Sequence, residues 1–212
     1  MALTTVHLVR HGEVHNPGGV LYGRLPGFRL SALGERMAER VGEEMTGRDV
    51  TVVTASPLER AQATAAPTAR AVGVGIGTDG RLIEAGNLFE GLTFGVGDGS
   101  LKRPAHWWTL RNPFRPSWGE PYVAIATRML AAVATARDLA RGHEAVLVSH
   151  QLPIWTARCA AEGRRLWHDP RSRECTLASV TSLTYADDEL VDVAYSEPAR
   201  DLLPVQPQVA GA

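Results

Sequence analysis

Three short apolar runs separate segments of helical periodicity, and this alternation constrains the fold more than any other feature of the chain. Residues 4–9, 51–54 and 144–150 are dense in apolar and β-branched residues, as are strands buried on both faces of a parallel sheet. After the first run, Ser31 precedes apolar residues at four-residue spacing, which predicts a capped amphipathic helix over residues 31–45. We therefore expect an α/β fold, a three-layer α/β/α sandwich with a largely parallel central sheet.

Proline and glycine predict where the other helices begin and end. Ser56-Pro57 is typical of an N-cap followed by proline at the first helical position. Pro67 is expected to kink or end the helix that starts there. Glu120-Pro121 should open the longest helix of the chain, and Gly142 should close it.

The remaining segments predict shorter elements. Residues 72–80 are rich in glycine and suit a turn or a short edge strand. Residues 152–161 favour another helix, and residues 176–197 indicate two strands joined by a turn at Asp187-Asp188.

The length of 212 residues favours one domain, because domains contain about 150 residues on average. We expect this domain to occupy residues 1–197. Residues 95–119 show no regular period, and we interpret them as an irregular lid or insertion loop. Residues 198–212 contain prolines and are expected to form a mobile C-terminal tail.

Composition excludes several classes of function. Hydrophobic residues make up 44% of the chain and charged residues 21%, as in an ordinary soluble globular protein. A net charge of −1 gives no general attraction to nucleic acid or acidic lipid, so an anion site requires a local group of arginines. Residues 1–11 resemble neither a secretory signal nor a membrane span. Cys159 and Cys175 lack metal or redox spacing, which favours reduced thiols and a cytoplasmic location, while the oligomeric state is left open.

Basic side chains follow the predicted strands. Arg10 and His11 end the first run, His150 ends the third, and Arg60 lies in the first turn of the helix after the second. Because ligands bind beyond the carboxyl ends of parallel strands, we expect these side chains to meet at one edge. Guanidiniums match phosphoryl oxygens, and a neutral imidazole can attack phosphorus. These residue types favour His11 as the nucleophile and His150 as a donor that stabilises the transition state.

Four sequence blocks resemble the histidine phosphatase superfamily, the phosphoglycerate-mutase-like enzymes. The blocks are "LVRHGEV", "SPLERAQATA", "RLIEAGNLFEG" and "VLVSHQLPI", and they occur in the family's order within residues 6–154. The resemblance implies that His11 becomes phosphohistidine and that Arg10, Arg60 and His150 hold the phosphoryl group. It further implies that Glu84 is the proton donor, and that the fold is phosphoglycerate-mutase-like.

Glu84 suits the chemistry that this resemblance implies. The leaving oxygen of a phosphate ester needs a proton and the later attack of water needs a base, so one carboxyl group can serve both steps. Glu90 competes for the role, but the family places its acid six residues before the counterpart of Glu90, which would leave Glu90 as a supporting or helix-capping carboxylate. Burial would raise the pKa of Glu84 and nearby arginines would lower it, so the direction of the shift is open.

Three other residues are candidates for contact with phosphate or substrate. Asn16 lies six residues after Arg10, whereas family members commonly place an asparagine seven residues after the motif arginine. Arg24, in "YGR", resembles a segment at the rim of the family's pocket, with a surface salt bridge as the alternative. Gln151 stands where many members have glycine, and it could narrow the mouth of the site.

The sequence favours a phosphatase that hydrolyses a small phosphorylated metabolite. The alternatives are a mutase or phosphotransferase of the phosphoglycerate type, and a non-catalytic binding module on the same fold. The chain lacks the tryptophan- and asparagine-bearing stretch that usually follows the RHG motif in glycolytic mutases, which favours hydrolysis. We expect no metal and no other cofactor, because arginines supply the positive charge. The tryptophans and basic residues of 101–119 either contact an organic phosphate or pack the loop onto the sheet.

Overall fold

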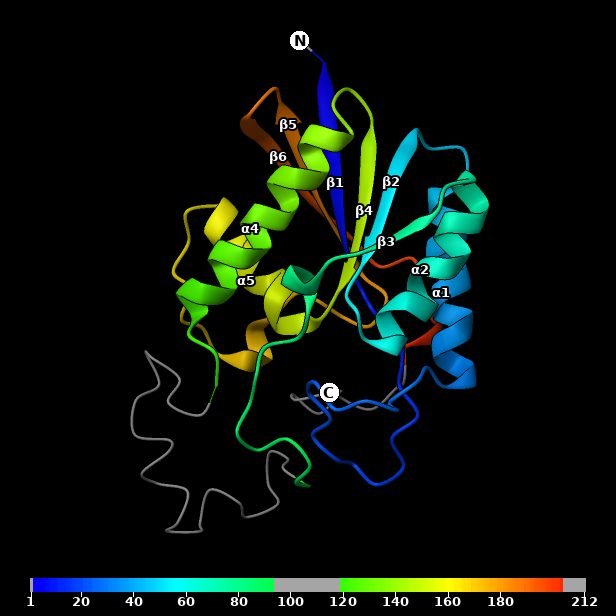
Figure 1. Cartoon of the computed structure of the whole chain (residues 1–212), viewed down its shortest axis with the longest axis vertical. Helices are drawn as coiled ribbons and strands as arrows, with labels where there is room; N and C mark the ends of the chain where they lie inside the picture. Colours follow the sequence, from blue (N-terminus) through cyan, green and yellow to red (C-terminus); the bar gives the residue numbers. More distant parts are fainter. Residues whose placement is uncertain (1, 94–118, 204–212) are drawn as a thin grey trace.

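The computed structural model describes residues 2–93 and 119–203, and a six-stranded sheet with the order β3-β2-β4-β1-β5-β6 forms its centre (Figure 1). Strands β1 to β4 run parallel to one another, whereas β5 and β6 pair antiparallel at one side of the sheet. The strands are Leu3–Arg10 (β1), Val50–Ala55 (β2), Ile76–Thr78 (β3), Glu144–Ser149 (β4), Val180–Ala186 (β5) and Glu189–Ser196 (β6). The predicted largely parallel sheet is confirmed.

Helices cover both faces of the sheet and complete the predicted three layers (Figure 1). Helices α1 and α2 pack against each other on one face, and α4 and α5 pack on the other. Short 3-10 turns connect some of these elements. The helices are Ala32–Met45 (α1), Glu59–Val72 (α2), Tyr122–Leu139 (α4) and Gln151–Ala161 (α5), and the 3-10 turns are Gly80–Leu82 (η1), Pro170–Ser172 (η3) and Arg200–Leu202 (η4).

Strand β1 is buried between the two helical layers. Val6 and Leu8 belong to the core beneath α4 and α5, whereas Val9 belongs to the core beneath α1 and α2. All three side chains are fully buried. Because alternate residues of a strand face opposite sides of the sheet, this two-sided burial requires the nearly continuous apolar run seen in the sequence.

The first helix begins as predicted, but other helix ends differ. Ser31 is the N-cap of α1, and its hydroxyl accepts a hydrogen bond from the Gly34 N–H at 3.0 Å. The prediction for Pro67 is wrong as to the end of the helix, because α2 continues to Val72 and ends at Gly73 in the left-handed conformation. Helix α4 ends at Leu139, before Gly142, the residue that was predicted to close it.

The predicted cap at Ser56 is also wrong. Leu58 occupies the N-cap position of α2 and makes no side-chain capping bond. The Ser56 hydroxyl is instead hydrogen-bonded to His150, which directly follows β4, the strand next to β2. The dipeptide Ser56-Pro57 therefore marks the end of a strand and a turn before the helix.

The structure describes the predicted edge strand, the predicted turn at Asp187-Asp188 and the first residues of the expected tail. The glycine-rich segment forms the short edge strand β3, and Asp187-Asp188 joins β5 to β6. Residues 198–203 carry η4, where Asp201 forms an ion pair with Arg40 of α1. The rest of the expected tail, and the expected lid except Gly119, lie outside the described residues. No helix among the described residues is long and apolar enough to cross a membrane.

Candidate active site

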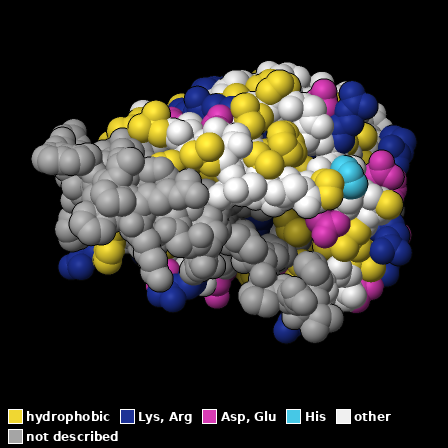
Figure 2. All heavy atoms as spheres, turned by 90° about the horizontal axis from the view of Figure 1, so that it is seen from below, with side chains coloured by type: hydrophobic (Ala, Val, Ile, Leu, Met, Phe, Trp, Pro, Cys, Tyr) yellow, Lys and Arg dark blue, Asp and Glu magenta, His cyan; other side chains and the backbone are white. Residues whose placement is uncertain are grey.

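The two histidines of the sequence motifs lie side by side at the carboxyl ends of neighbouring parallel strands. Arg10 of β1 is in register with Ser149 of β4, so the residues that follow them, His11 and His150, emerge together. Both imidazoles are fully buried, with ring centroids 5.1 Å apart and ring planes at 61°. Figure 2 looks from below Figure 1, toward the end where these strands finish, and shows the surface hollowed.

A backbone hydrogen bond fixes the tautomer of His11. Its Nδ1 atom lies 2.8 Å from the Gly12 carbonyl oxygen, which can only accept, so Nδ1 carries the proton. The Nε2 atom is buried and has no hydrogen-bond partner among the described residues. Burial lowers the pKa of His11 well below its ordinary value, and the charges of Arg60 and Arg10 lower it further. The ring is therefore neutral, with the lone pair on Nε2.

Gly12 holds this histidine against helix α1. A side-chain Cβ at position 12 would lie 2.5 Å from the Gly34 carbonyl oxygen, so only glycine fits without a backbone shift. The Gly12 N–H donates to the Thr64 hydroxyl of α2 at 3.1 Å. The absence of a side chain at this position thus lets the backbone that follows His11 approach Gly34 of α1 closely.

Two buried guanidiniums accompany the histidines. Arg10 donates to the Cys175 carbonyl at 2.7 Å, and Arg60 donates to the Gly23 carbonyl at 2.6 Å. The Arg60 guanidinium also lies 4.7 Å from the centre of the Tyr22 ring. Arg60 forms no ion pair with a carboxylate among the described residues. A buried cation without a counter-ion favours an anionic ligand.

Ser56 orients the second histidine. Its oxygen accepts a hydrogen bond from the Leu58 N–H at 3.4 Å and lies 2.9 Å from His150 Nε2. The hydroxyl has one proton and two lone pairs, so it can donate to Nε2 or accept from it, and when it donates, the ring proton lies on Nδ1. Burial lowers the pKa of His150 well below its ordinary value, and the neighbouring His11 and arginines add to this effect.

Glu84 places a carboxyl group beside His150. The Oε2 atom of Glu84 lies 4.0 Å from His150 Nδ1, and the side chain is 15% exposed. Its Oε1 atom accepts a hydrogen bond from the Ala85 N–H at 2.8 Å. Burial raises the pKa of Glu84, although the Ala85 N–H and the charges of Arg60 and Arg10 oppose the rise. The direction that the sequence left open is therefore decided by burial.

Glu90, the competing carboxylate, closes a turn. Its Oε1 atom accepts a hydrogen bond from the Asn87 N–H at 3.2 Å. The side chain also packs so closely on Gly23, which has a φ of +40°, that any Cβ there would overlap it. These contacts give Glu90 a structural role in the loop that carries Glu84.

Asn16 does not join the two histidines through any described contact. Its side-chain amide donates to the Val20 carbonyl at 2.8 Å, and its side-chain oxygen accepts from the Val20 N–H at 3.0 Å. Both polar ends of the side chain thus close the loop that follows β1.

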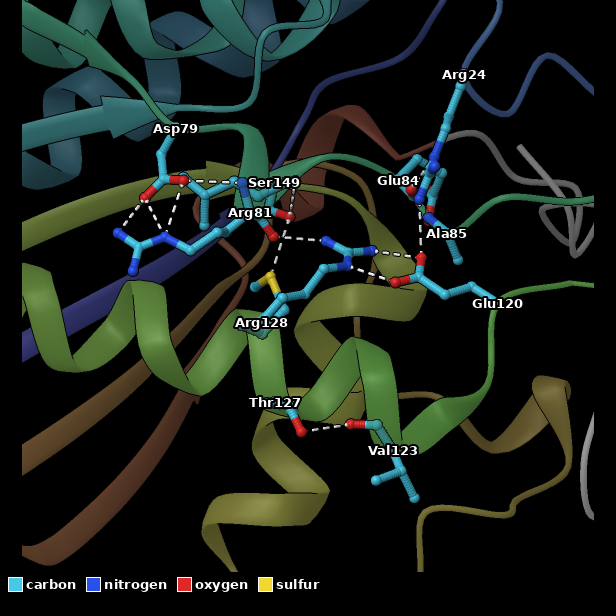
Figure 3. Close-up of polar contacts among 12 residues, drawn as sticks. Arg24, Asp79, Arg81, Glu84, Ala85, Glu120, Val123, Thr127, Arg128 and Ser149 are labelled. Carbon is cyan, nitrogen blue, oxygen red and sulfur yellow. Dashed lines mark hydrogen bonds and ion pairs between the residues drawn. The ribbon is translucent and has the colours of Figure 1, made fainter.

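Arg24 braces the segment that carries Glu84 (Figure 3). Its Nε atom donates to the Glu84 carbonyl at 2.7 Å, and its Nη2 atom donates to Glu120 at 2.8 Å. Arg128 of α4 donates to both oxygens of the same Glu120 carboxylate and to the Arg81 carbonyl. Arg24 is therefore a partly buried link between the Glu84 backbone and α4.

Gln151 lies at the start of α5 and connects two parts of the site. Its amide donates to the Cys175 carbonyl at 3.4 Å, the same oxygen that accepts from Arg10. Its side-chain oxygen accepts from Arg173 at 3.3 Å.

Sequence reasoning missed three residues of this region, namely Ser56, Tyr22 and Arg173. Ser56 was interpreted as a helix cap. Its position directly after a predicted strand could have indicated that it lies at the same edge of the sheet as His11 and His150. Tyr22 belongs to the "YGR" segment, and its buried ring contacts Arg60 and His11. Arg173 had no signal, because it reaches the site from a loop after α5. The described residues contain no group of three His, Cys, Asp or Glu side chains placed to hold a metal ion.

Comparison with known proteins places this arrangement in a family. A sequence model described as histidine phosphatase superfamily (branch 1) matches residues 6–197. An uncharacterized protein of Mycobacterium tuberculosis is 61% identical over 196 residues, which cover 92% of this chain and 97% of the relative. A probable phosphoglycerate mutase, GpmB, of Salmonella choleraesuis is 30% identical over 183 residues, which cover 82% and 83% of the two chains.

Solved structures with the same fold agree with this match. The native mycobacterial glucosyl-3-phosphoglycerate phosphatase superposes with a TM-score of 0.74 at 24% identity, covering 92% of this chain and 98% of that one. The YhfR protein of Bacillus stearothermophilus gives a TM-score of 0.73 at 25% identity, covering 89% and 94% of the two chains. The predicted phosphoglycerate-mutase-like fold is confirmed.

Proposed function

The chain belongs to the histidine phosphatase superfamily, and on that premise we propose that it hydrolyses a small organic phosphate monoester through a phosphohistidine at His11. The observation that carries the proposal is the state of the His11 ring. Its Nε2 atom is buried, has no hydrogen-bond partner among the described residues, and holds a lone pair because Nδ1 donates to Gly12. Such a nitrogen is a pre-formed nucleophile.

In the first step, Nε2 of His11 attacks phosphorus and the bond from phosphorus to the ester oxygen breaks. The leaving oxygen takes its proton from Glu84, so an alcohol departs and a phosphohistidine is left. The raised pKa of Glu84 favours the protonated carboxyl that this step requires.

In the second step, a water molecule attacks the phosphohistidine. The Glu84 carboxylate formed in the first step removes a proton from this water, and the bond from phosphorus to Nε2 breaks. Inorganic phosphate is released, while His11 and the protonated Glu84 are restored. One carboxyl group thus serves as acid and then as base.

Arg10, Arg60 and His150 are proposed to hold the transferring phosphoryl group. The two buried guanidiniums supply positive charge that needs no rearrangement during the reaction. When the Ser56 hydroxyl donates to Nε2 of His150, the ring proton lies on Nδ1 and would be donated to a phosphoryl oxygen. The proposed chemistry requires no metal, so a chelator should leave the activity unchanged.

A mutase of the phosphoglycerate type is the second candidate. The observation in its favour is the 30% identity to a probable phosphoglycerate mutase. A mutase must keep water from the phosphoenzyme until a second phosphorylated acceptor arrives. Turnover of phosphoglycerate with catalytic bisphosphoglycerate, at a rate far above that of phosphate release, would favour this candidate over the phosphatase.

Release of phosphate from a generic aryl phosphate tests the proposed function. The wild-type protein should release phosphate, and His11→Ala should release it at least about a thousandfold more slowly, because no other group replaces the nucleophile. Equal rates for the two proteins would refute the enzymatic role of His11. A panel of phosphorylated metabolites would then identify the preferred small-molecule substrate.

A further inference from the structure

Arg173 lies beside the phosphoryl pocket and is linked to it by two shared partners. Its Nη1 atom donates to Gln151 at 3.3 Å, and Gln151 in turn donates to the Cys175 carbonyl at 3.4 Å. That carbonyl also accepts from Arg10 at 2.7 Å. The charge of Arg173 is also near enough to oppose the raised pKa of Glu84. The guanidinium thus adjoins the site from the side of α5.

A neutral histidine holds the Arg173 side chain. The Nδ1 atom of His168 lies 2.7 Å from the Leu166 carbonyl, which can only accept, so this nitrogen carries the proton. His168 Nε2 then accepts a hydrogen bond from Arg173 Nε at 2.8 Å. The His168 ring lies 5.6 Å from the Tyr122 ring and 5.8 Å from the Trp155 ring, centre to centre. These rings limit the movement of the support on which Arg173 rests.

Arg173 differs from the arginines around it because its positive charge is not neutralised. Arg158, Arg164 and Arg171 each form an ion pair with a carboxylate. Arg173 has only the neutral acceptors of His168 and Gln151, and it forms no ion pair within the described parts of the chain. Its Nη2 atom has no hydrogen-bond partner there either. A partly buried guanidinium with a free donor is suited to bind an anion.

We propose that Arg173 forms a second anion subsite, which binds a carboxylate or second phosphoryl group on the body of the substrate while its phosphoryl group occupies the pocket of His11. The proposal rests on the proposed function and narrows its substrate class to phosphate monoesters that carry another anionic group. Gln151 spaces the two positive centres, since it contacts Arg173 and the carbonyl shared with Arg10.

Binding to a His11→Ala background tests the subsite without turnover. Three probes are compared by calorimetry: glycerol 3-phosphate, 3-phosphoglycerate, and propanediol bisphosphate. Adding Arg173→Gln should weaken the binding of the two probes that carry a second anionic group by about tenfold, as loss of a charge-assisted hydrogen bond does. The affinity for glycerol 3-phosphate should stay within about twofold of its value before the substitution. The probe that loses more affinity identifies the second anion as carboxylate or phosphoryl. Equal weakening of all three probes, or no weakening, would overturn the proposal.

Control variants separate binding from folding. Arg171→Gln removes a neighbouring arginine that is 79% exposed and paired with Asp169, and it should leave all three affinities unchanged. Arg173→Lys keeps the positive charge but not the planar guanidinium, and it should retain part of the preference for probes that carry a second anionic group. If Arg173→Lys binds no better than Arg173→Gln although both unfold at the wild-type temperature, charge recognition is refuted. If the wild-type protein releases no phosphate from any of these probes while the preference remains, the proposed function is refuted and the subsite is not.

Discussion

Nδ1 of His150 lies 4.0 Å from Oε2 of Glu84 in the interior of the site. Burial shifts the pKa values of the two groups in opposite directions, lowering that of His150 and raising that of Glu84. Both shifts favour the uncharged form. A neutral imidazole and a protonated carboxyl beside two guanidiniums are the states that a phosphate dianion and its leaving group require.

The pH dependence of kcat/KM should report these shifts. His11 must be neutral to attack, so activity should fall as the pH drops through its lowered pKa. Glu84 must be protonated to release the alcohol, so activity should also fall as the pH rises through its raised pKa. Glu84→Gln should lose about 10²–10⁴ in rate on an alkyl phosphate and lose the alkaline limb. An alkaline limb that persists in Glu84→Gln would assign it to another group.

Replacement of Ser56 by alanine should disturb the proton on His150 without unfolding α2. We propose that the hydroxyl donates to Nε2 and so keeps the ring proton on Nδ1, and kcat should then fall by about tenfold or more when the hydroxyl is lost. Ser31→Ala is the matched control, because it removes the N-cap of α1 and should cost about 1 kcal/mol of stability with kcat unchanged. Enzyme assays and urea unfolding of both variants separate the two effects. Unchanged kcat in Ser56→Ala would contradict this role.

Glu120→Gln should loosen the segment that carries Glu84. The substitution weakens the contacts that Arg24 and Arg128 make with one carboxylate, and Arg24 holds the Glu84 backbone (Figure 3). We expect kcat to fall about tenfold and the alkaline limb of the pH profile to move, while KM for the phosphate ester changes little. Glu59→Gln, which breaks an exposed ion pair with Arg29, is the control, and it should change neither kcat nor the alkaline limb of the pH profile.

Stability should fall as the pH is lowered below about 6.5, the ordinary histidine pKa. Burial lowers the folded-state pKa of His7, His11 and His150, so the unfolded chain binds more protons in this range. Glu84 has a raised pKa and therefore increases the stability of the fold as the pH is lowered, but this one group opposes three histidines.

His7 offers a test of this effect away from the active site. It is buried in β1, between Ser182 and Glu144. His7→Gln should reduce the pH slope of the unfolding free energy, by at most about 1.4 kcal/mol per pH unit, and leave kcat unchanged. Stability that is flat between pH 7.5 and 5.5 would contradict the account.

The fold was largely predictable because the parallel strands are buried on both faces, which leaves continuous apolar runs in the sequence. The behaviour of Pro67 was not predictable in this way. A Cβ on Gly42 would come within 3.0 Å of Pro67, so α1 and α2 pack closely at this point, and such tertiary contact is not visible in local sequence. The hydroxyl of Ser56 likewise found a partner 94 residues away.

The histidines and arginines of the site were predictable because they directly follow strands whose ends must meet at one edge. The roles of Asn16 and Arg24 depended on how loops close, which the spacing of residues does not determine. The pKa direction of Glu84 depended on its burial, a property of the assembled fold. Arg173 is positioned by His168 and Gln151 from two other segments, so no motif could indicate it.

Mass spectrometry of the protein quenched in alkali during turnover would detect the proposed phosphohistidine itself. We expect an acid-labile, base-stable phosphate on His11 that forms with the aryl phosphate, decays as substrate is exhausted, and is absent from His11→Ala. Turnover without phosphate on His11, or phosphate on another side chain that forms and decays at the catalytic rate, would contradict the account.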